Sequence, residues 1–147
     1  MIKLTIKNCK SKPTGHIFHQ RAKDGTIIKS WISQGSDYLN WKSEQVELVR
    51  KQLPSDYQTK SRVCGVVARI CLAPNRKGHP PDLYNLIGSV ADILTQAKIW
   101  TDDNVNVSDC LHARIIYNQK ELTTVFVCEN ILEYSSMILD ELFLIQQ

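Results

Sequence analysis

RVCGVVARICL, residues 62–72, is the stretch of sequence that decides the fold. It is rich in Val and Ile and almost continuously apolar, which is typical of a buried strand in the middle of a sheet. We therefore expect the core of the protein to be built around this strand.

A helix and two strands are predicted downstream of it. Residues 73–81 (APNRKGHPP) hold three prolines and a glycine, which favours a loop. Residues 82–98 carry apolar side chains at intervals of three and four, so they are expected to form an amphipathic helix. After a polar turn at residues 100–106, residues 107–117 and 123–128 are predicted to be strands, and the short interval between them indicates a hairpin.

Upstream, two strands and a loop are expected before the first helix. Residues 1–7 alternate apolar and polar side chains, which predicts a strand with one face in water. Residues 8–25 are polar and basic and are predicted to be a loop, and residues 26–32 a short strand.

Two more helices are predicted. Ser36 or Asp37 is expected to cap one that Pro54 ends. Residues 132–145 have a wide apolar face at helical spacing. We expect this face to pack on the sheet, and the alternative is a seam between two copies of the chain.

The order of these elements predicts an α+β fold with a mixed sheet and helices packed against it. The chain has 147 residues, of which 43% are hydrophobic and 22% charged. This fits a single domain of residues 1–147, with residues 130–147 as a C-terminal helical extension, and it excludes a disordered chain.

No membrane partner is expected. The apolar runs are far shorter than the roughly 18–20 residues that a membrane span requires. Residues 1–8 lack the apolar stretch of a secretory signal, so we expect a cytoplasmic protein. Five scattered cysteines, none closely paired as in C-x2-C, indicate reduced and mostly buried thiols and argue against structural zinc.

Charge is unevenly divided along the chain. Residues 1–81 hold 15 Lys and Arg against 5 Asp and Glu, a balance of +10, whereas residues 82–147 hold 3 against 10, a balance of −7. A basic half beside a carboxylate-rich half suits a protein that binds a polyanion with one surface and a metal ion with the other. Ordinary solvated charge is the competing interpretation.

Carboxylates recur between residues 80 and 105 (PPDLYNLIGSVADILTQAKIWTDDNV). Asp82 stands where the loop enters the helix, and Asp102 and Asp103 lie in the turn after it. One interpretation is an ordinary N-cap at Asp82, with Asn85 as its capping-box partner, and an ordinary turn. The other is a Mg²⁺ site, because this ion takes one or two protein carboxylates and lets substrate phosphate complete its coordination. Asp82 and Asp103 meet only if the chain doubles back.

This stretch resembles the RusA-type Holliday junction resolvases. The resemblance rests on three elements: Asp82-Leu83-x-Asn85-Leu86, the helix with Asp92-Ile93-Leu94 and Ala97, and Trp100-x-Asp102-Asp103 followed by Val105. Weaker similarity extends upstream, and the tail from Asn130 looks like an addition.

The resemblance implies a RusA-like fold and a homodimeric, Mg²⁺-dependent endonuclease of prokaryotic or phage origin, in which Mn²⁺ can substitute. Such an enzyme binds four-way DNA junctions and resolves them by paired symmetric nicks, in DNA recombination and repair. The resemblance also implies that Asp82 and Asp103 bind the metal and act in catalysis, with Asp102 as a further contributor.

Two positions depart from the family pattern, because Tyr84 and Gly88 stand where the family usually has an Asp and a Lys. The departures lower the negative charge of the site and remove a cation that could stabilise a leaving oxygen. The alternative function is therefore a branched-DNA-binding homologue with weakened catalysis. A second alternative is a protein interaction domain without a DNA role, whose acidic tail from Glu121 binds a partner.

Basic residues on loops are the candidates for DNA contact. They are Lys12, His16, His19, Arg21 and Lys23 in the early loop, and Arg76 and Lys77 in the loop before Asp82. Clustering of cations on loops supports this assignment. Asp92 lies about 15 Å along the helix from Asp82, so we expect it in an ion pair or a helix cap.

Overall fold

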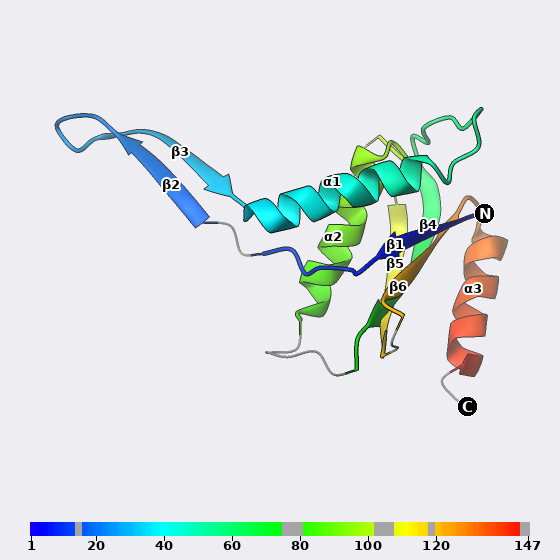
Figure 1. Ribbon diagram of the computed structural model, residues 1–147. Coiled ribbons are helices and arrows are strands. Elements are labelled where there is room, and N and C mark those ends of the chain that lie inside the picture. Colours follow the sequence, from blue (N-terminus) through cyan, green and yellow to red (C-terminus); the bar gives the residue numbers. More distant parts are fainter. Residues whose placement is uncertain (14–15, 75–80, 102–107, 118–119, 145–147) are drawn as a thin grey trace.

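The structure, a computed structural model, describes residues 1–13, 16–74, 81–101, 108–117 and 120–144, with the backbone alone described for residues 16–18, 31–33, 108–109 and 144. The elements in chain order are β1 (Ile2–Lys7), β2 (His16–Arg21), β3 (Ile27–Ser33), α1 (Ser36–Arg50), β4 (Val63–Leu72), α2 (Leu83–Gln96), β5 (Ser108–Tyr117), β6 (Leu122–Cys128) and α3 (Ile131–Leu144). The protein is α+β with a mixed four-stranded sheet, as predicted (Figure 1).

The central position predicted for residues 62–72 is confirmed by β4. The sheet has the strand order β1-β6-β4-β5, in which β4 pairs with β5 in parallel and with β6 in antiparallel orientation. Since β4 and β5 run in parallel, α2 is the crossover between them. The strand is buried along nearly all of its length, which explains why its sequence does not alternate between apolar and polar residues.

The predicted hairpin of residues 107–117 and 123–128 is wrong. Both strands exist, as β5 and β6, but β4 lies between them. β4, which is apolar along its length, pairs with β5 along one edge and with β6 along the other. Periodicity identified the strands but could not identify their partners.

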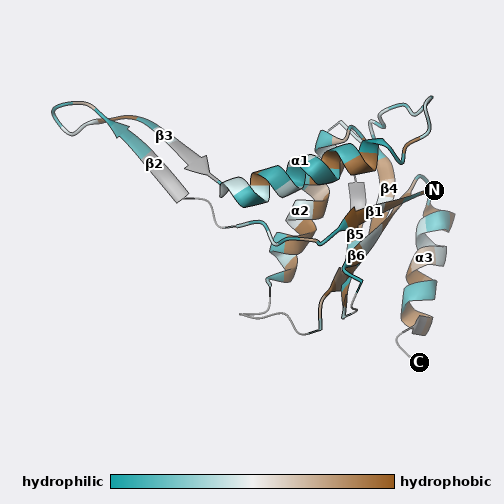
Figure 2. Cartoon of the chain, in the orientation of Figure 1, coloured by the Kyte–Doolittle hydropathy of each residue, from teal (hydrophilic) through white to brown (hydrophobic). Residues whose placement is uncertain are grey.

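Helices cover both faces of the sheet. On one face, α1 and α2 enclose the main core, in which Trp41, Leu86 and Ile70 are buried. On the other face, α3 closes a smaller cluster around Val67, Phe126, and its own Met137. Figure 2 shows the alternation of hydrophilic and hydrophobic sides on α1 and α2. The expectation that the C-terminal helix packs on the sheet is thus confirmed for Met137 and Ile138. Leu139, Leu142 and Phe143, which belong to the same predicted apolar face, are exposed instead.

The ends of α1 differ from the prediction. Gly35 is the N-cap residue, and no side chain caps the helix, so neither Ser36 nor Asp37 has the predicted role. The helix ends at Arg50, before Pro54 is reached. Beyond it the chain tightens into three-residue turns, in which the N–H of Gln52 donates to the carbonyl of Val49 at 3.0 Å and that of Leu53 to the carbonyl of Arg50 at 3.2 Å. Among the described helices, none has the length and apolar character needed to cross a membrane.

The five cysteines all lie in described residues, and none forms a disulfide. Cys9 and Cys128 are buried, whereas Cys110 is exposed. Burial raises the pKa of the Cys128 thiol, which keeps it protonated and unreactive near neutral pH.

The loop predicted for residues 8–25 is wrong in its second half. Residues 16–21 form β2, which pairs with β3 in antiparallel orientation; we call residues 16–33 the arm. At its turn Gly25 has φ +85°, and the carboxylate of Asp24 accepts the N–H of Thr26 at 2.9 Å. The arm projects away from the four-stranded sheet (Figure 1). The short strand predicted for residues 26–32 is confirmed by β3, whereas β2 was missed because it pairs with β3 and not with the core.

Candidate nucleic-acid interface

Asp82 is the N-cap of α2, as one of the two interpretations predicted. Its Oδ1 accepts the N–H of Tyr84 at 2.8 Å, and the residue is exposed. A carboxylate here is also stabilised by the positive end of the helix dipole. Asn85, in the first turn, accepts the N–H of Lys12 at its backbone oxygen at 3.1 Å. The start of α2 therefore lies beside the segment that leads into the arm.

Asp102 and Asp103 lie outside the described residues. The residues that flank them are described: the N–H of Thr101 donates to the carbonyl of Lys60 at 3.1 Å, and Ser108 is the register partner of Val63. Thr101 and Ser108, the two anchors of this turn, are therefore held near the start of β4, whereas Asp82 follows the end of β4.

The 14 residues of α2 span about 21 Å between these two places. The described chain thus does not double back between Asp82 and Thr101, and a metal site shared by Asp82 and Asp103 stays a prediction. Within the described ranges, no group of three or more His, Cys, Asp or Glu side chains could hold a metal ion.

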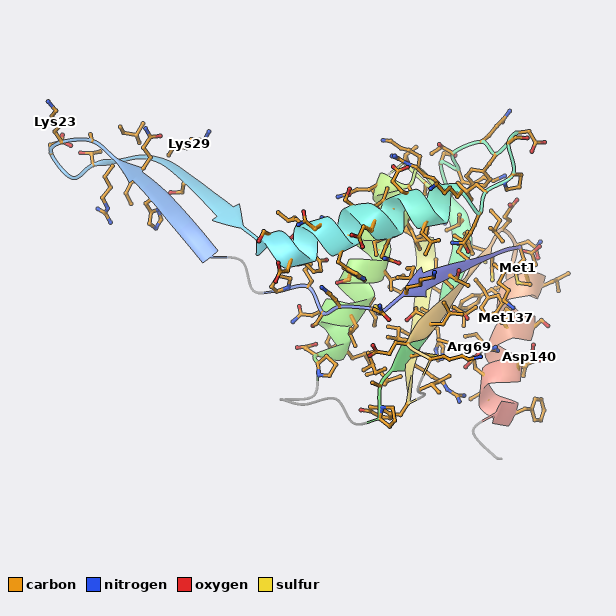
Figure 3. All side chains as sticks on the ribbon, in the orientation of Figure 1. Met1, Lys23, Lys29, Arg69, Met137 and Asp140 are labelled. Atoms are coloured by element: carbon orange, nitrogen blue, oxygen red, sulfur yellow. The ribbon has the colours of Figure 1, made fainter. Side chains whose placement is uncertain are left out.

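The arm carries most of the described basic candidates. His19 Nδ1 lies 2.8 Å from the hydroxyl oxygen of Ser30, and Arg21 donates to the carbonyl of Gly25 at 3.0 Å. Lys23 is near the turn, and Figure 3 shows it at the far end of the arm. The backbone of His16 lies in β2, while Arg76 and Lys77 lie outside the described residues.

Sequence reasoning missed Lys29, which extends from β3 on the same arm (Figure 3). The signal was present, since Lys29 lies in a segment predicted as a strand and Gly25 marks a turn before it. The arm also exposes Ile27 and Ile28, by 46% and 64%.

The arm has a net positive charge and is open to solvent. Of its described side chains, residues 19–30, all but the half-buried Ala22 are exposed. Arg21, Lys23 and Lys29 outnumber the single carboxylate of Asp24. Hydrogen bonds from Thr26 hold the carboxylate of Asp24 in the turn, and the same bonds lower its pKa. An isolated two-stranded ribbon is only marginally stable in water, so a partner that covers the arm would stabilise it.

Lys12 has a role inside the protein that the sequence did not indicate. Its Nζ lies 2.9 Å from Oδ2 of Asp92, and Lys42 Nζ lies 3.9 Å from the same oxygen. The ion pair expected for Asp92 is thus confirmed. The contact with Lys12 ties the segment before the arm to α2. The contact with Lys42 ties α1, which follows the arm, to the same carboxylate.

Comparison of the chain with known protein families and with curated proteins finds no match. The resemblance to RusA-type resolvases therefore rests on the motif residues themselves.

Proposed function

We propose that the protein binds branched DNA through the arm. The observation that supports this most directly is an exposed two-stranded ribbon with three cations and one carboxylate, extended away from the body of the molecule (Figure 3). The major groove of B-DNA is about 12 Å wide and admits a two-stranded ribbon. When the arm lies in this groove, Lys23 and Lys29 neutralise phosphates, and the exposed Ile27 and Ile28 lose contact with water.

The preference for branched DNA and the cleavage activity rest on the resemblance. We propose that Mg²⁺, or Mn²⁺ in its place, binds at Asp82. The resemblance to RusA-type resolvases adds Asp103 and Asp102 as ligands, but the length of α2 separates Asp82 from the residues that flank them, so water and substrate phosphate would complete the coordination at Asp82. When bound, the metal would supply an activated water and would stabilise charge on the phosphate. The observation that favours this second activity is the exposed carboxylate of Asp82 beside the segment that leads into the arm. Tyr84, which stands beside Asp82 where the family usually has an Asp, is 83% exposed and supplies no carboxylate to the site. The alternative of a homologue with weakened catalysis rests on this substitution.

Binding is tested by mobility shift with a four-way junction and a matched duplex at several salt concentrations. The variant Lys23→Ala/Lys29→Ala should weaken junction binding about tenfold and lower the slope of log K against log salt by about 2. The control Lys51→Ala/Lys98→Ala removes the same charge from exposed positions at the ends of α1 and α2 and should keep the wild-type slope. If the unmodified protein shifts no DNA at low salt, the protein interaction alternative replaces this proposal.

Cleavage is tested with the same junction in Mg²⁺ or Mn²⁺. Asp82→Asn should abolish nicking and retain binding, because Asn caps a helix as well as Asp does while it lacks the charge that a metal requires. If the unmodified protein binds the junction but never nicks it in either metal, the chain is a binding homologue without catalysis.

A further inference from the structure

The side of the sheet that α3 covers is basic around one aromatic ring. Phe126 of β6 is the register partner of Lys3 on β1 and of Val67 on β4. Lys3 Nζ lies 5.9 Å from the centroid of this ring, and Cζ of Arg69 lies 5.2 Å from it. Arg114 of β5 is the register partner of Arg69, and register partners lie on the same side of a sheet. Three cations from three strands thus share one side of the sheet with Phe126.

The strands themselves carry no carboxylate that would neutralise these cations. β1, β4 and β6 contain neither Asp nor Glu, and neither does β5 from Cys110 onward. The sheet therefore presents a polyanion with cations alone on this side, together with one ring on which a flat group can stack.

The carboxylates that lie on this side come from α3. Glu141 is 1% exposed and contacts both Arg69 and Arg114, and Glu133 bonds to the amine of Met1 at 2.8 Å. Two guanidinium groups around one oxyanion are also the arrangement in which arginines bind phosphate. Glu141 thus occupies a position that suits a phosphate group.

We infer that this side of the sheet binds single-stranded nucleic acid, and that α3 covers it as an internal competitor. When α3 is displaced, a base stacks on Phe126 while Lys3, Arg69 and Arg114 contact phosphates. Four-stranded sheets bind single-stranded RNA in this manner, through aromatic side chains on one face. A duplex does not fit the site, because its bases are already stacked inside the helix. The inference rests on this side of the sheet and does not depend on the proposed function of the arm.

The attachment of α3 is incomplete, which favours its displacement. Oε2 of Glu141 is buried without a hydrogen-bond partner among the described residues, although Arg114 Nη1 lies 3.4 Å from it. A buried carboxylate with an unsatisfied oxygen costs free energy. Among the described apolar side chains of α3, Met137 is the one that is fully buried. Release of α3 therefore exposes little buried apolar surface of the helix itself.

A site that is covered binds more weakly than the same site when open. The apparent affinity falls with the fraction of molecules in which the site is open. A substitution that weakens the attachment of α3 should therefore tighten the binding of a single strand. Simple damage to the protein has the opposite effect.

Fluorescence anisotropy with labelled oligothymidylate and oligouridylate of about 12 nucleotides tests the inference. Every protein compared carries Lys23→Ala/Lys29→Ala, so that the lysines of the arm do not contribute. In this background Glu141→Gln should raise the affinity at least about fivefold. The control Asp140→Asn removes the same charge from the exposed neighbouring position and should leave the affinity within about twofold. Comparison of the two oligonucleotides shows whether the site prefers DNA or RNA.

Two further measurements locate the bound strand. Phe126→Leu added to Glu141→Gln should lower the affinity about tenfold, because stacking on the ring is lost while an apolar side chain remains under α3. Amide hydrogens of α3 should exchange faster when the oligonucleotide is bound, because a displaced helix loses protection. No binding by the Glu141→Gln variant, equal effects of Glu141→Gln and Asp140→Asn, full affinity after Phe126→Leu, or unchanged exchange of α3 would each overturn the inference.

Discussion

Gly65 in β4 is the residue that allows α3 to lie close to the sheet. A Cβ added at this position would overlap Cδ2 of Tyr134, well inside any normal contact. We expect Gly65→Ala to lower the free energy of unfolding by about 1–3 kcal/mol, because the ring and its helix must move outward. Urea denaturation measures this change.

Gly88 in α2 provides the matched control. A Cβ there would meet the side chain of Lys12 at 3.7 Å, an ordinary contact. Gly88→Ala should therefore stabilise the protein by about 0.5–1 kcal/mol, since alanine favours a helix. Equal effects of the two substitutions would show that the Tyr134 contact does not limit the position of α3.

The contrast between these residues shows what sequence can reveal at this scale. The N-cap at Asp82 was predictable, because a cap depends on residues two or three positions away. The contact of Gly65 with Tyr134 joins positions far apart in the chain, and no local pattern encodes it. For Asp92 the sequence predicted an ion pair but not its partner. Lys12 lies far from Asp92 in the chain, and no local pattern joins the two.

At the scale of elements, α3 is attached by one buried carboxylate as well as by apolar contacts. Glu141 is only 1% exposed, and its side chain contacts Arg69 from β4 and Arg114 from β5. Arg114 also donates to the carbonyl of Glu141 at 3.1 Å, which satisfies a backbone oxygen near the end of the helix. Figure 3 shows Arg69 directed toward α3.

Glu141→Gln should lower the free energy of unfolding by about 1–3 kcal/mol, because two guanidinium groups then face a neutral amide. The effect is smaller than for a fully buried pair, since the arginine side chains remain about a quarter exposed. Asp140→Asn at the neighbouring exposed position should change stability by less than about 0.5 kcal/mol. Chemical denaturation compares the two variants, and an unchanged Glu141→Gln protein would contradict the prediction.

Elements of the core were predictable from period alone, whereas their partners and the strand β2 of the arm were not. The strand of residues 62–72 and the helix of residues 82–98 have strong apolar patterns because each packs on the core. The strand β2 has no such pattern, because cross-strand pairing with β3 holds it. The hairpin error has the same origin, since a strand's sequence does not record which strand lies beside it.

At the scale of the whole molecule, the start of the chain is held to its C-terminal helix. The amine of Met1 lies 2.8 Å from Oε1 of Glu133, and the N–H of Glu129 donates to the other oxygen at 2.8 Å. The bond to the N-terminal amine and that from Glu129 lower the pKa of Glu133 below its usual 4.5. Folding therefore favours the ionised carboxylate.

The pKa of Glu133 is lower in the folded protein than in the unfolded chain. The stability that its ionised carboxylate contributes is therefore present above pH 4.5 and is lost as the pH falls below 4.5 through the folded pKa. A contact at the surface is worth about 0.5 kcal/mol. Glu133→Gln should thus flatten the decline in stability between about pH 5 and pH 3, measured by denaturation at each pH. A variant with the wild-type slope in this window would exclude the contact as a source of acid sensitivity.

The division of charge along the sequence is only in part a division in space. Three cations of the first half extend on the arm and three carboxylates of the second half lie on α3 at the other side of the molecule (Figure 1), but Arg69 of the first half contacts Glu141 and Lys12 contacts Asp92. Charge counts could predict such a polarity but not its axis. The candidate metal site was predictable only as a motif, because Asp82 and the anchors that flank Asp102 and Asp103 are separated by the length of α2.

The shared carboxylate of Asp92 has a mechanical consequence. Lys12 comes from the strand-side entrance to the arm and Lys42 from the helix at its exit, and both lean on the same oxygen atom of α2. One carboxylate on α2 therefore holds the chain on both sides of the arm, so its removal would release the segment that enters the arm and the helix that leaves it together.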